Sequence, residues 1–197
     1  LDSAPDLQSI CLFLITDFVW REVQKDRETK KILLFDECWQ LLESEAGSQF
    51  IGNVFRTFRK YYAGVIAISQ DIDDFARSKV ASAILPNSST KWILMQKGAN
   101  QARLAEVLQL NETEASLVAS LYQERGKFSE AFLISGDHRS VVAIEPTPME
   151  YWIATTDPRD VTFFEKTRIE NPGKSTSEIL KRLASTISYG IANASSN

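Results

Sequence analysis

The chain has 197 residues, and 44% of them are apolar, which is enough to bury the core of one domain or of one domain with an appendage. Its net charge of −4 and its pI of about 5.2 argue against a uniformly basic surface for duplex DNA, although a local basic patch stays compatible with them. The two cysteines, Cys11 and Cys38, lie inside apolar periodic segments, so we expect small buried residues and no disulfide framework.

The first predicted element is a helix that begins near residue 6 or 9 and ends near residue 25. Apolar side chains recur there at helical spacing and also fill much of the opposite side, so we expect a helix that is packed on most of its surface. Its longest strongly apolar stretch, residues 10 to 15, is far too short to span a bilayer. Because the chain opens with Leu1 and not with Met, we expect an excised piece of a longer polypeptide.

The most informative segment follows. Residues 31 to 35 predict a buried strand, and two adjacent acids, Asp36 and Glu37, emerge at its C-terminal end. This pattern is typical of the Walker B motif of P-loop ATPases, in which one acid serves the Mg²⁺ of a nucleotide and the next orients the attacking water. Many α/β proteins also end a buried strand in acids, because the loops after strands are polar. The seven residues alone leave both interpretations open.

The remaining periodicity predicts further helices and strands, punctuated by glycine and proline. In chain order they are a short helix at 38–43, a break at 45–47, a long helix at 48–62, a strand at 65–68, a helical turn capped by Asp71, a loop at 86–89, a strand at 91–95, helices at 99–110 and from 111, a hairpin of strands 128–134 and 141–144, and helices at 149–155, 158–170 and 175–191. Strands that alternate with helices up to residue 98 predict a parallel sheet with helices on both faces. Ligands bind beyond the carboxyl ends of the strands in such sheets.

Two further groups are candidates for a nucleotide site. Gln70 follows the strand at 65–68, where an amide can contact a γ-phosphate or the attacking water, or can simply be a polar residue that closes a strand. Arg56, Arg59 and Lys60 lie at i, i+3 and i+4 on the long helix, away from its aromatic face. They form either a solvated basic face or an arginine finger that enters the nucleotide site of a neighbouring subunit.

The order of these features resembles the TraC-type conjugative-transfer ATPases of type IV secretion systems. The similarities are the acid pair followed by Trp39, Leu41 and Leu42, the pair Arg59 and Lys60 ahead of Gly64, and Ser69 and Gln70 followed by Asp71. The resemblance is strong over about residues 1 to 98 and carries few specific motifs beyond them.

The resemblance implies an α/β fold: part of a RecA-like P-loop NTPase domain, with a mostly parallel sheet flanked by helices, a β-hairpin and a C-terminal helical extension. Residues 1–156 would be the C-terminal portion of the ATPase domain, and residues 157–197 the extension. It also implies a homo-hexamer, cytoplasmic and peripheral at the bacterial inner membrane, that energises pilus assembly and DNA transfer. Other type IV secretion ATPases and inner-membrane channel subunits would be its partners, with DNA as a candidate partner.

The same resemblance assigns roles to individual residues. Asp36 would serve the Mg²⁺ of bound ATP, Glu37 would be the catalytic carboxylate that also contacts the nucleotide, and Gln70 would be the sensor. Arg59, and after it Arg56, would act across a subunit interface. The family's Walker A loop would lie ahead of Leu1, so we expect the chain alone to have no appreciable ATPase activity and to bind nucleotide weakly or not at all. Two alternatives stay open: a related DNA-pumping P-loop ATPase, and a docking platform whose C-terminal helices recruit other secretion subunits.

Residues 173 to 176, Gly-Lys-Ser-Thr, resemble the tail of a Walker A motif. Arg168 stands where that motif requires its upstream glycine, and the segment follows a predicted helix and not a strand. We therefore expect Ser175 and Glu178 to form a capping box at the start of the last helix. Trp39 is expected to be an anchor in the core or at an interface.

Overall fold

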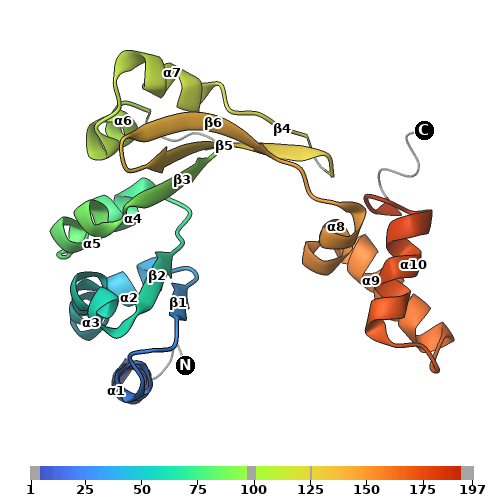
Figure 1. Ribbon diagram of the computed structural model, residues 1–197, viewed down its shortest axis with the longest axis horizontal. Helices are drawn as coiled ribbons and strands as arrows, with labels where there is room; N and C mark the ends of the chain where they lie inside the picture. Colours follow the sequence, from blue (N-terminus) through green and yellow to red (C-terminus); the bar gives the residue numbers. More distant parts are fainter. Residues whose placement is uncertain (1–4, 97–100, 125, 192–197) are drawn as a thin grey trace. The chain divides into compact units, whose positions relative to one another are not determined.

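The computed structural model describes residues 5–96, 101–124 and 126–191 (Figure 1). They form two compact units, the first over Leu1–Lys91 and Gly98–Asn111 and the second over Trp92–Lys97 and Glu112–Asn197. The elements of the first unit are α1 (Pro5–Lys25), β1 (Lys31–Phe35), α2 (Trp39–Leu42), α3 (Glu45–Thr57), the 3-10 helix η1 (Phe58–Tyr61), β2 (Ala63–Ala67), α4 (Ile72–Ala76), α5 (Ala81–Asn87) and α6 (Gln101–Leu108). The second unit holds most of β3 (Thr90–Leu94), and α7 (Glu112–Ala119), β4 (Gln123–Glu124), β5 (Phe128–Ser135), β6 (His138–Ile144), α8 (Pro148–Ala154), α9 (Pro158–Glu170) and α10 (Thr176–Thr186).

The centre of the first unit is the parallel pair β1 and β2, which runs in register from Lys31 opposite Ala63 to Phe35 opposite Ala67. The predicted strand and its parallel pairing are thus confirmed. Helix α3 contributes Ile51 and Val54, both fully buried, to the hydrophobic cluster that also contains Phe35. Burying an aliphatic side chain of this size stabilises the fold by roughly 1.5–3 kcal/mol.

Only one face of this two-stranded sheet is covered by the described residues. Side chains alternate along a strand, so Leu33 and Phe35 pack against the cluster while Ile32 is 73% exposed and Leu34 is 53% exposed. The prediction of helices on both faces is therefore not met within these residues. A run of four apolar residues indicates burial on both faces, but it does not say which segment supplies the second layer.

The third predicted strand joins a different sheet. Among the described residues, β3 pairs with β5 in a sheet of order β3-β5-β4, and β6 pairs with the same β5. β5 is eight residues long, so it offers β3 a longer edge than the five-residue strands of the first unit. It also buries Ala131 and Phe132 almost completely. The predicted hairpin is confirmed: β5 and β6 pair antiparallel, and the turn between them contains Gly136 at φ +58°.

Several local boundaries differ from the prediction; the long helix predicted at 48–62, for example, is α3 followed by η1. Residues 45 to 47 form the first turn of α3 and not a break, because the side chain of Ser44 caps the helix by accepting a hydrogen bond of 3.0 Å from the backbone N–H of Gly47. A Cβ at Gly47 would lie 2.2 Å from the carbonyl oxygen of Leu41, so glycine is needed there for close packing. Pro86 lies inside α5 and not in a loop, and α10 ends at Thr186, earlier than predicted.

Helices α8 to α10 share a small hydrophobic cluster of their own, formed by Trp152, Ile179 and Leu183. The capping box predicted at Ser175 and Glu178 is confirmed at the start of α10. Residues 173 to 176 therefore begin a helix with a capping box and do not form a phosphate-binding loop. The predicted boundary after residue 156 falls between α8 and α9, inside the second unit, and stays a prediction. Throughout the described ranges, no helix combines the length and the apolarity that a bilayer crossing requires.

Candidate functional site at the carboxyl ends of β1 and β2

Backbone hydrogen bonds continue beyond the last paired residues of β1 and β2. The N–H of Ile68 donates to the carbonyl of Phe35 at 2.9 Å, and the N–H of Cys38 donates to the carbonyl of Ile68 at 3.0 Å. These two bonds connect the segment after β1 to the segment after β2. They therefore bring Glu37 and Gln70 to the same edge of the sheet.

Glu37 is the residue on which the contacts of this edge converge. One carboxylate oxygen, Oε1, accepts a hydrogen bond of 2.7 Å from the amide Nε2 of Gln70, and the other, Oε2, accepts one of 2.7 Å from the indole Nε1 of Trp39. The expected proximity of Gln70 to the acid pair is thus observed. The backbone of Glu37 is left-handed, at φ +50°, a conformation that costs a non-glycine residue on the order of 1–3 kcal/mol and is concentrated at functional sites.

The contact of Trp39 is the feature that sequence reasoning missed. The indole N–H of Trp39 can only donate a hydrogen bond, and the nearby carboxylate of Glu37 is an acceptor for it. The available signal was the spacing: Trp39 stands two residues after Glu37 at the start of a short helix, where the chain turns back on itself. Trp39 is half-buried and is not among the side chains packed against the hydrophobic cluster of the first unit, so its expected role as an anchor in the core or at an interface stays a prediction.

Asp36 faces solvent beside Glu37. Its carboxylate Oδ1 accepts a hydrogen bond of 3.1 Å from the backbone N–H of Glu37, and among the described residues it has no ion pair with a cation. An accessible carboxylate with spare acceptor positions is the ligand type that Mg²⁺ prefers, directly or through water. Asp36 therefore fits the nucleotide-bound Mg²⁺ that the Walker B pattern implies.

Negative charge gathers around these strand ends. The pKa of the Cys38 thiol is raised to about 12, by burial first and then by the carboxylates of Asp74 and Glu37. A thiol with so high a pKa stays protonated at neutral pH, which makes Cys38 a poor nucleophile, and its expected burial is confirmed. The surrounding carboxylates favour a bound cation.

Arg59 and Arg56 lie at the opposite end of the same strands. Arg59 belongs to η1, which directly precedes β2, and Arg56 lies in the last turn of α3. A five-residue strand spans roughly 16 Å, so neither guanidinium is brought next to Glu37 within the chain. Both side chains are exposed, and neither forms an ion pair with another described residue.

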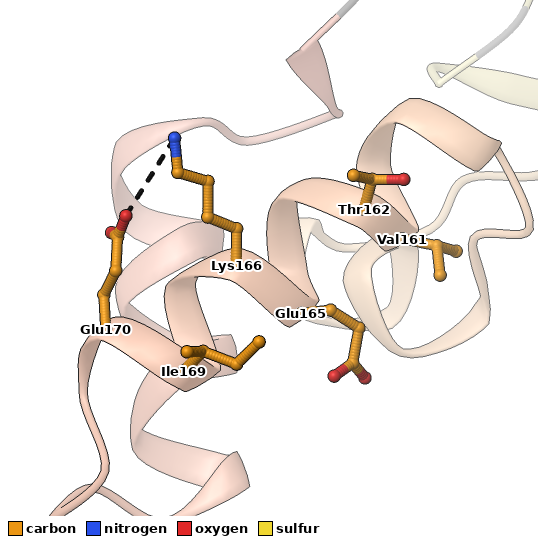
Figure 2. A pocket seen from close by; sticks show the side chains of 6 residues that line it. All are labelled: Val161, Thr162, Glu165, Lys166, Ile169 and Glu170. Atoms are coloured by element: carbon orange, nitrogen blue, oxygen red, sulfur yellow. Dashed lines mark ion pairs between the residues drawn. The ribbon is translucent and has the colours of Figure 1, made fainter.

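A pocket of the second unit lies on one face of α9, away from the acid pair in sequence and in a different unit (Figure 2). It is lined by Val161, Thr162, Glu165, Lys166, Ile169 and Glu170. Lys166 and Glu170, four positions apart on α9, form a loose ion pair of 4.0 Å, and Ile169 is 75% exposed. No acid or amide of the candidate site contributes to this pocket.

Comparison with known proteins identifies relatives over nearly all of the chain. The TraG P-loop domain family matches residues 1–187. Protein TraC of Escherichia coli (strain K12) is 26% identical over 193 residues, and the type IV secretion system protein virB4 of Bartonella quintana (strain Toulouse) is 30% identical over 112 residues, 57% of this chain. A solved structure of VirB4 of Thermoanaerobacter pseudethanolicus matches with a TM-score of 0.58 and 27% identity over 71% of this chain.

These relatives are much longer than the matched segment. The match takes up 93% of this chain but 22% of TraC, and it takes up 14% of the Bartonella VirB4 and 37% of the solved VirB4 chain. The family match, by contrast, covers well over half of the chain and includes both strand ends of the candidate site. The chain therefore belongs to the TraG P-loop domain family and is a relative of the TraC and VirB4 proteins of type IV secretion.

Proposed function

We propose that the chain is the Walker B and sensor portion of an ATPase that energises type IV secretion, including conjugative pilus assembly and DNA transfer. It would work inside a longer polypeptide, as the lengths of its relatives suggest, and as a homo-hexamer, cytoplasmic and peripheral at the bacterial inner membrane. The observation that carries the proposal is the carboxylate of Glu37, which accepts hydrogen bonds from Gln70 and Trp39 at the carboxyl edge of two parallel strands.

Each residue of the edge has a distinct role in this proposal. Asp36 would hold the Mg²⁺ of ATP, and the metal would neutralise negative charge that develops on the transferred phosphoryl group. Glu37 accepts the proton of the attacking water or orients that water. Gln70 exchanges its bond to Glu37 for a bond to the γ-phosphate or the water, because a side-chain amide offers both a donor and an acceptor.

Arg59, with Arg56 as second candidate, acts in a neighbouring subunit. The support for this assignment is their place at the far end of the strands, their exposure and their lack of ion pairs among the described residues. A guanidinium pairs with two phosphate oxygens at once, which suits charge that shifts during phosphoryl transfer.

Other secretion ATPases and inner-membrane channel subunits would be the partners of the assembled ring. If DNA stimulates ATP turnover, that result would favour the alternative of a related DNA-pumping ATPase.

The test is ATP turnover in the longer native polypeptide, in wild type and in Glu37→Gln. We expect Glu37→Gln to lower kcat by about 10²–10⁴-fold, because it removes the base and keeps the shape. Glu43→Gln, which neutralises an exposed acid on the same short segment, is the matched control and should leave kcat unchanged. We also expect no turnover from the 197-residue chain alone, and turnover that survives Glu37→Gln would reject the assignment.

A second candidate function, a docking platform for other secretion subunits, is favoured by the surface of α9. Ile169 is 75% exposed and Val161 is 43% exposed beside the pocket of Figure 2. Both residues line the same pocket, and it is a contiguous exposed apolar surface, not a single exposed aliphatic residue, that marks a protein contact site. If this function dominates, Ile169→Glu should abolish binding of the purified channel subunits while ATP turnover stays at the wild-type level. Lys181→Gln on α10, an exposed residue outside the pocket lining, is the control.

A further inference from the structure

We infer that Trp39 is a positioning residue for Glu37, and that its indole N–H keeps the carboxylate oriented for hydrolysis. The inference deepens the proposed function and rests on it. Its basis is the 2.7 Å hydrogen bond from Nε1 of Trp39 to Oε2 of Glu37, made between residues only two positions apart.

The backbone around this contact leaves little freedom. Glu37 is fixed in a left-handed conformation, and the next residue, Cys38, is fully buried and bonded through its N–H to the carbonyl of Ile68. Trp39 then opens α2, where its carbonyl accepts from the N–H of Glu43 at 3.1 Å. Both ends of the hydrogen bond therefore belong to one short, tightly connected turn.

The two donors to Glu37 differ in a way that assigns them different tasks. Gln70 is exposed and reaches Glu37 across 33 positions of the chain, from the end of the neighbouring strand. Trp39 is half-buried and belongs to the same turn as Glu37. When the amide of Gln70 turns to a phosphate or a water, the indole is the donor that stays. A carboxylate with one oxygen fixed keeps the other oxygen aimed, which is the condition for efficient proton transfer.

The ring of Trp39 is not part of the hydrophobic cluster of the first unit. The described residues around the hydrophobic cluster of the first unit include Trp20, Leu41 and Leu42, but not Trp39. Trp20 contacts the rings of Phe58 and Tyr61, whereas the interaction of Trp39 that the structure shows is the polar one with Glu37. The inference therefore rests on the N–H group, whose hydrogen bond to Glu37 is observed.

The experiment removes that N–H without changing the shape of the ring. In the longer native polypeptide, Trp39 is replaced by 3-benzothienylalanine, in which sulfur stands in place of the N–H, and in a second variant by Phe. We expect kcat for ATP to fall on the order of 10- to 100-fold in both, with KM changed less than twofold, because misaligned catalytic groups lose rate and not substrate affinity. The same two replacements at Trp20 are the matched control and should keep kcat within twofold.

A second readout does not depend on catalysis. In the ¹⁵N-labelled chain, the indole N–H resonance of Trp39 should shift when Glu37 is changed to Ala, while those of Trp20, Trp92 and Trp152 stay in place. A wild-type kcat in the benzothienylalanine variant, or an indole resonance that ignores Glu37→Ala, would overturn the inference alone. Absence of ATP turnover in the wild-type polypeptide would overturn the proposed function and the inference with it.

Discussion

The two ends of the β1–β2 pair differ in how completely the chain satisfies its own charged groups. At the carboxyl end, both oxygens of Glu37 accept hydrogen bonds from side chains of the same unit. At the other end, Arg56 and Arg59 are exposed and have no ion pair among the described residues. The described residues thus hold the carboxylate of Glu37 in place at one end, whereas they supply no charged partner for the two arginines at the other. That difference is what we expect of a sheet whose ends serve two different nucleotide sites.

The largest effect on kcat is expected at the basic end of the β1–β2 pair, where Arg56 and Arg59 lie. In the assembled longer polypeptide, Arg59→Ala should lower kcat by about 10³-fold or more, because arginine fingers contribute roughly 10³–10⁵ in rate. Arg56→Ala should have a smaller effect. Lys60→Ala removes a neighbouring exposed charge and is the control, with less than a tenfold change in steady-state ATP turnover. Equal losses from all three variants would indicate a general charge effect and not a finger.

A smaller effect is expected at the carboxyl end. Gln70→Ala removes one of the two donors to Glu37 and should lower kcat on the order of 10- to 100-fold. Gln49→Ala, on α3, removes an exposed amide that bonds to Glu45 and should not change turnover. Rapid-quench measurement of the chemical step distinguishes the two variants. An unchanged chemical step in Gln70→Ala would contradict the sensor role.

Stability should respond separately from catalysis. Helix α3 begins after the carboxyl end and leads to η1 at the basic end, and Ser44 caps it. Ser44→Ala should lower the free energy of unfolding by about 1 kcal/mol, the usual value of a lost N-cap. Thr57→Ala, at the end of the same helix, is the control. If the free energy of urea unfolding is the same in Ser44→Ala as in the wild type, the Ser44 cap does not stabilise helix α3, which connects the two ends of the β1–β2 pair.

The smallest expected effect is a pH dependence at the basic end. Asp26 accepts hydrogen bonds from the backbone N–H groups of Glu28 and Thr29 at 2.7 and 3.3 Å. Its pKa is lowered to about 2, first by the Thr29 side chain, then by these backbone groups and last by the charge of Lys31. Because the unfolded chain binds this proton more readily, the stabilisation is complete above pH 4 and is lost as the pH falls through 2.

Asp26→Asn tests this dependence. Thermal unfolding of the variant, followed by circular dichroism, should lose less stability between pH 4 and pH 2 than that of the wild type. Glu28→Gln is the exposed control. Identical acid profiles for Asp26→Asn and the wild type would contradict the expected contribution.

The parts of the fold that depend on local pattern could be predicted from the sequence. Residues 32 to 35 are four consecutive apolar residues and form most of β1, and Ser175 with Glu178 forms the expected capping box. The proximity of Gln70 to Glu37 followed from a general property of parallel sheets, whose carboxyl ends lie at one edge.

The rest depends on contacts that no local pattern encodes. β3 pairs with β5, which lies more than thirty residues later, and strand alternation alone does not identify that partner. Residues 45 to 47 contain glycine and suggest a break, but the close packing of Gly47 on Leu41 makes them a helical turn. The hydrogen bond of Trp39 was missed because an indole two residues after an acid is read from the sequence as apolar bulk.

The central claim, that the two ends of one sheet serve different subunits, is tested most directly by mixing variants. Arg59→Ala and Glu37→Gln subunits are each expected to be almost inactive alone, yet a mixed ring contains sites in which Glu37 of one subunit meets Arg59 of its neighbour. We predict that equimolar mixing, after subunit exchange, restores ATP turnover to about a quarter of the wild-type rate, because random mixing makes about one interface in four intact. Turnover that stays at the level of the separate variants would contradict the account.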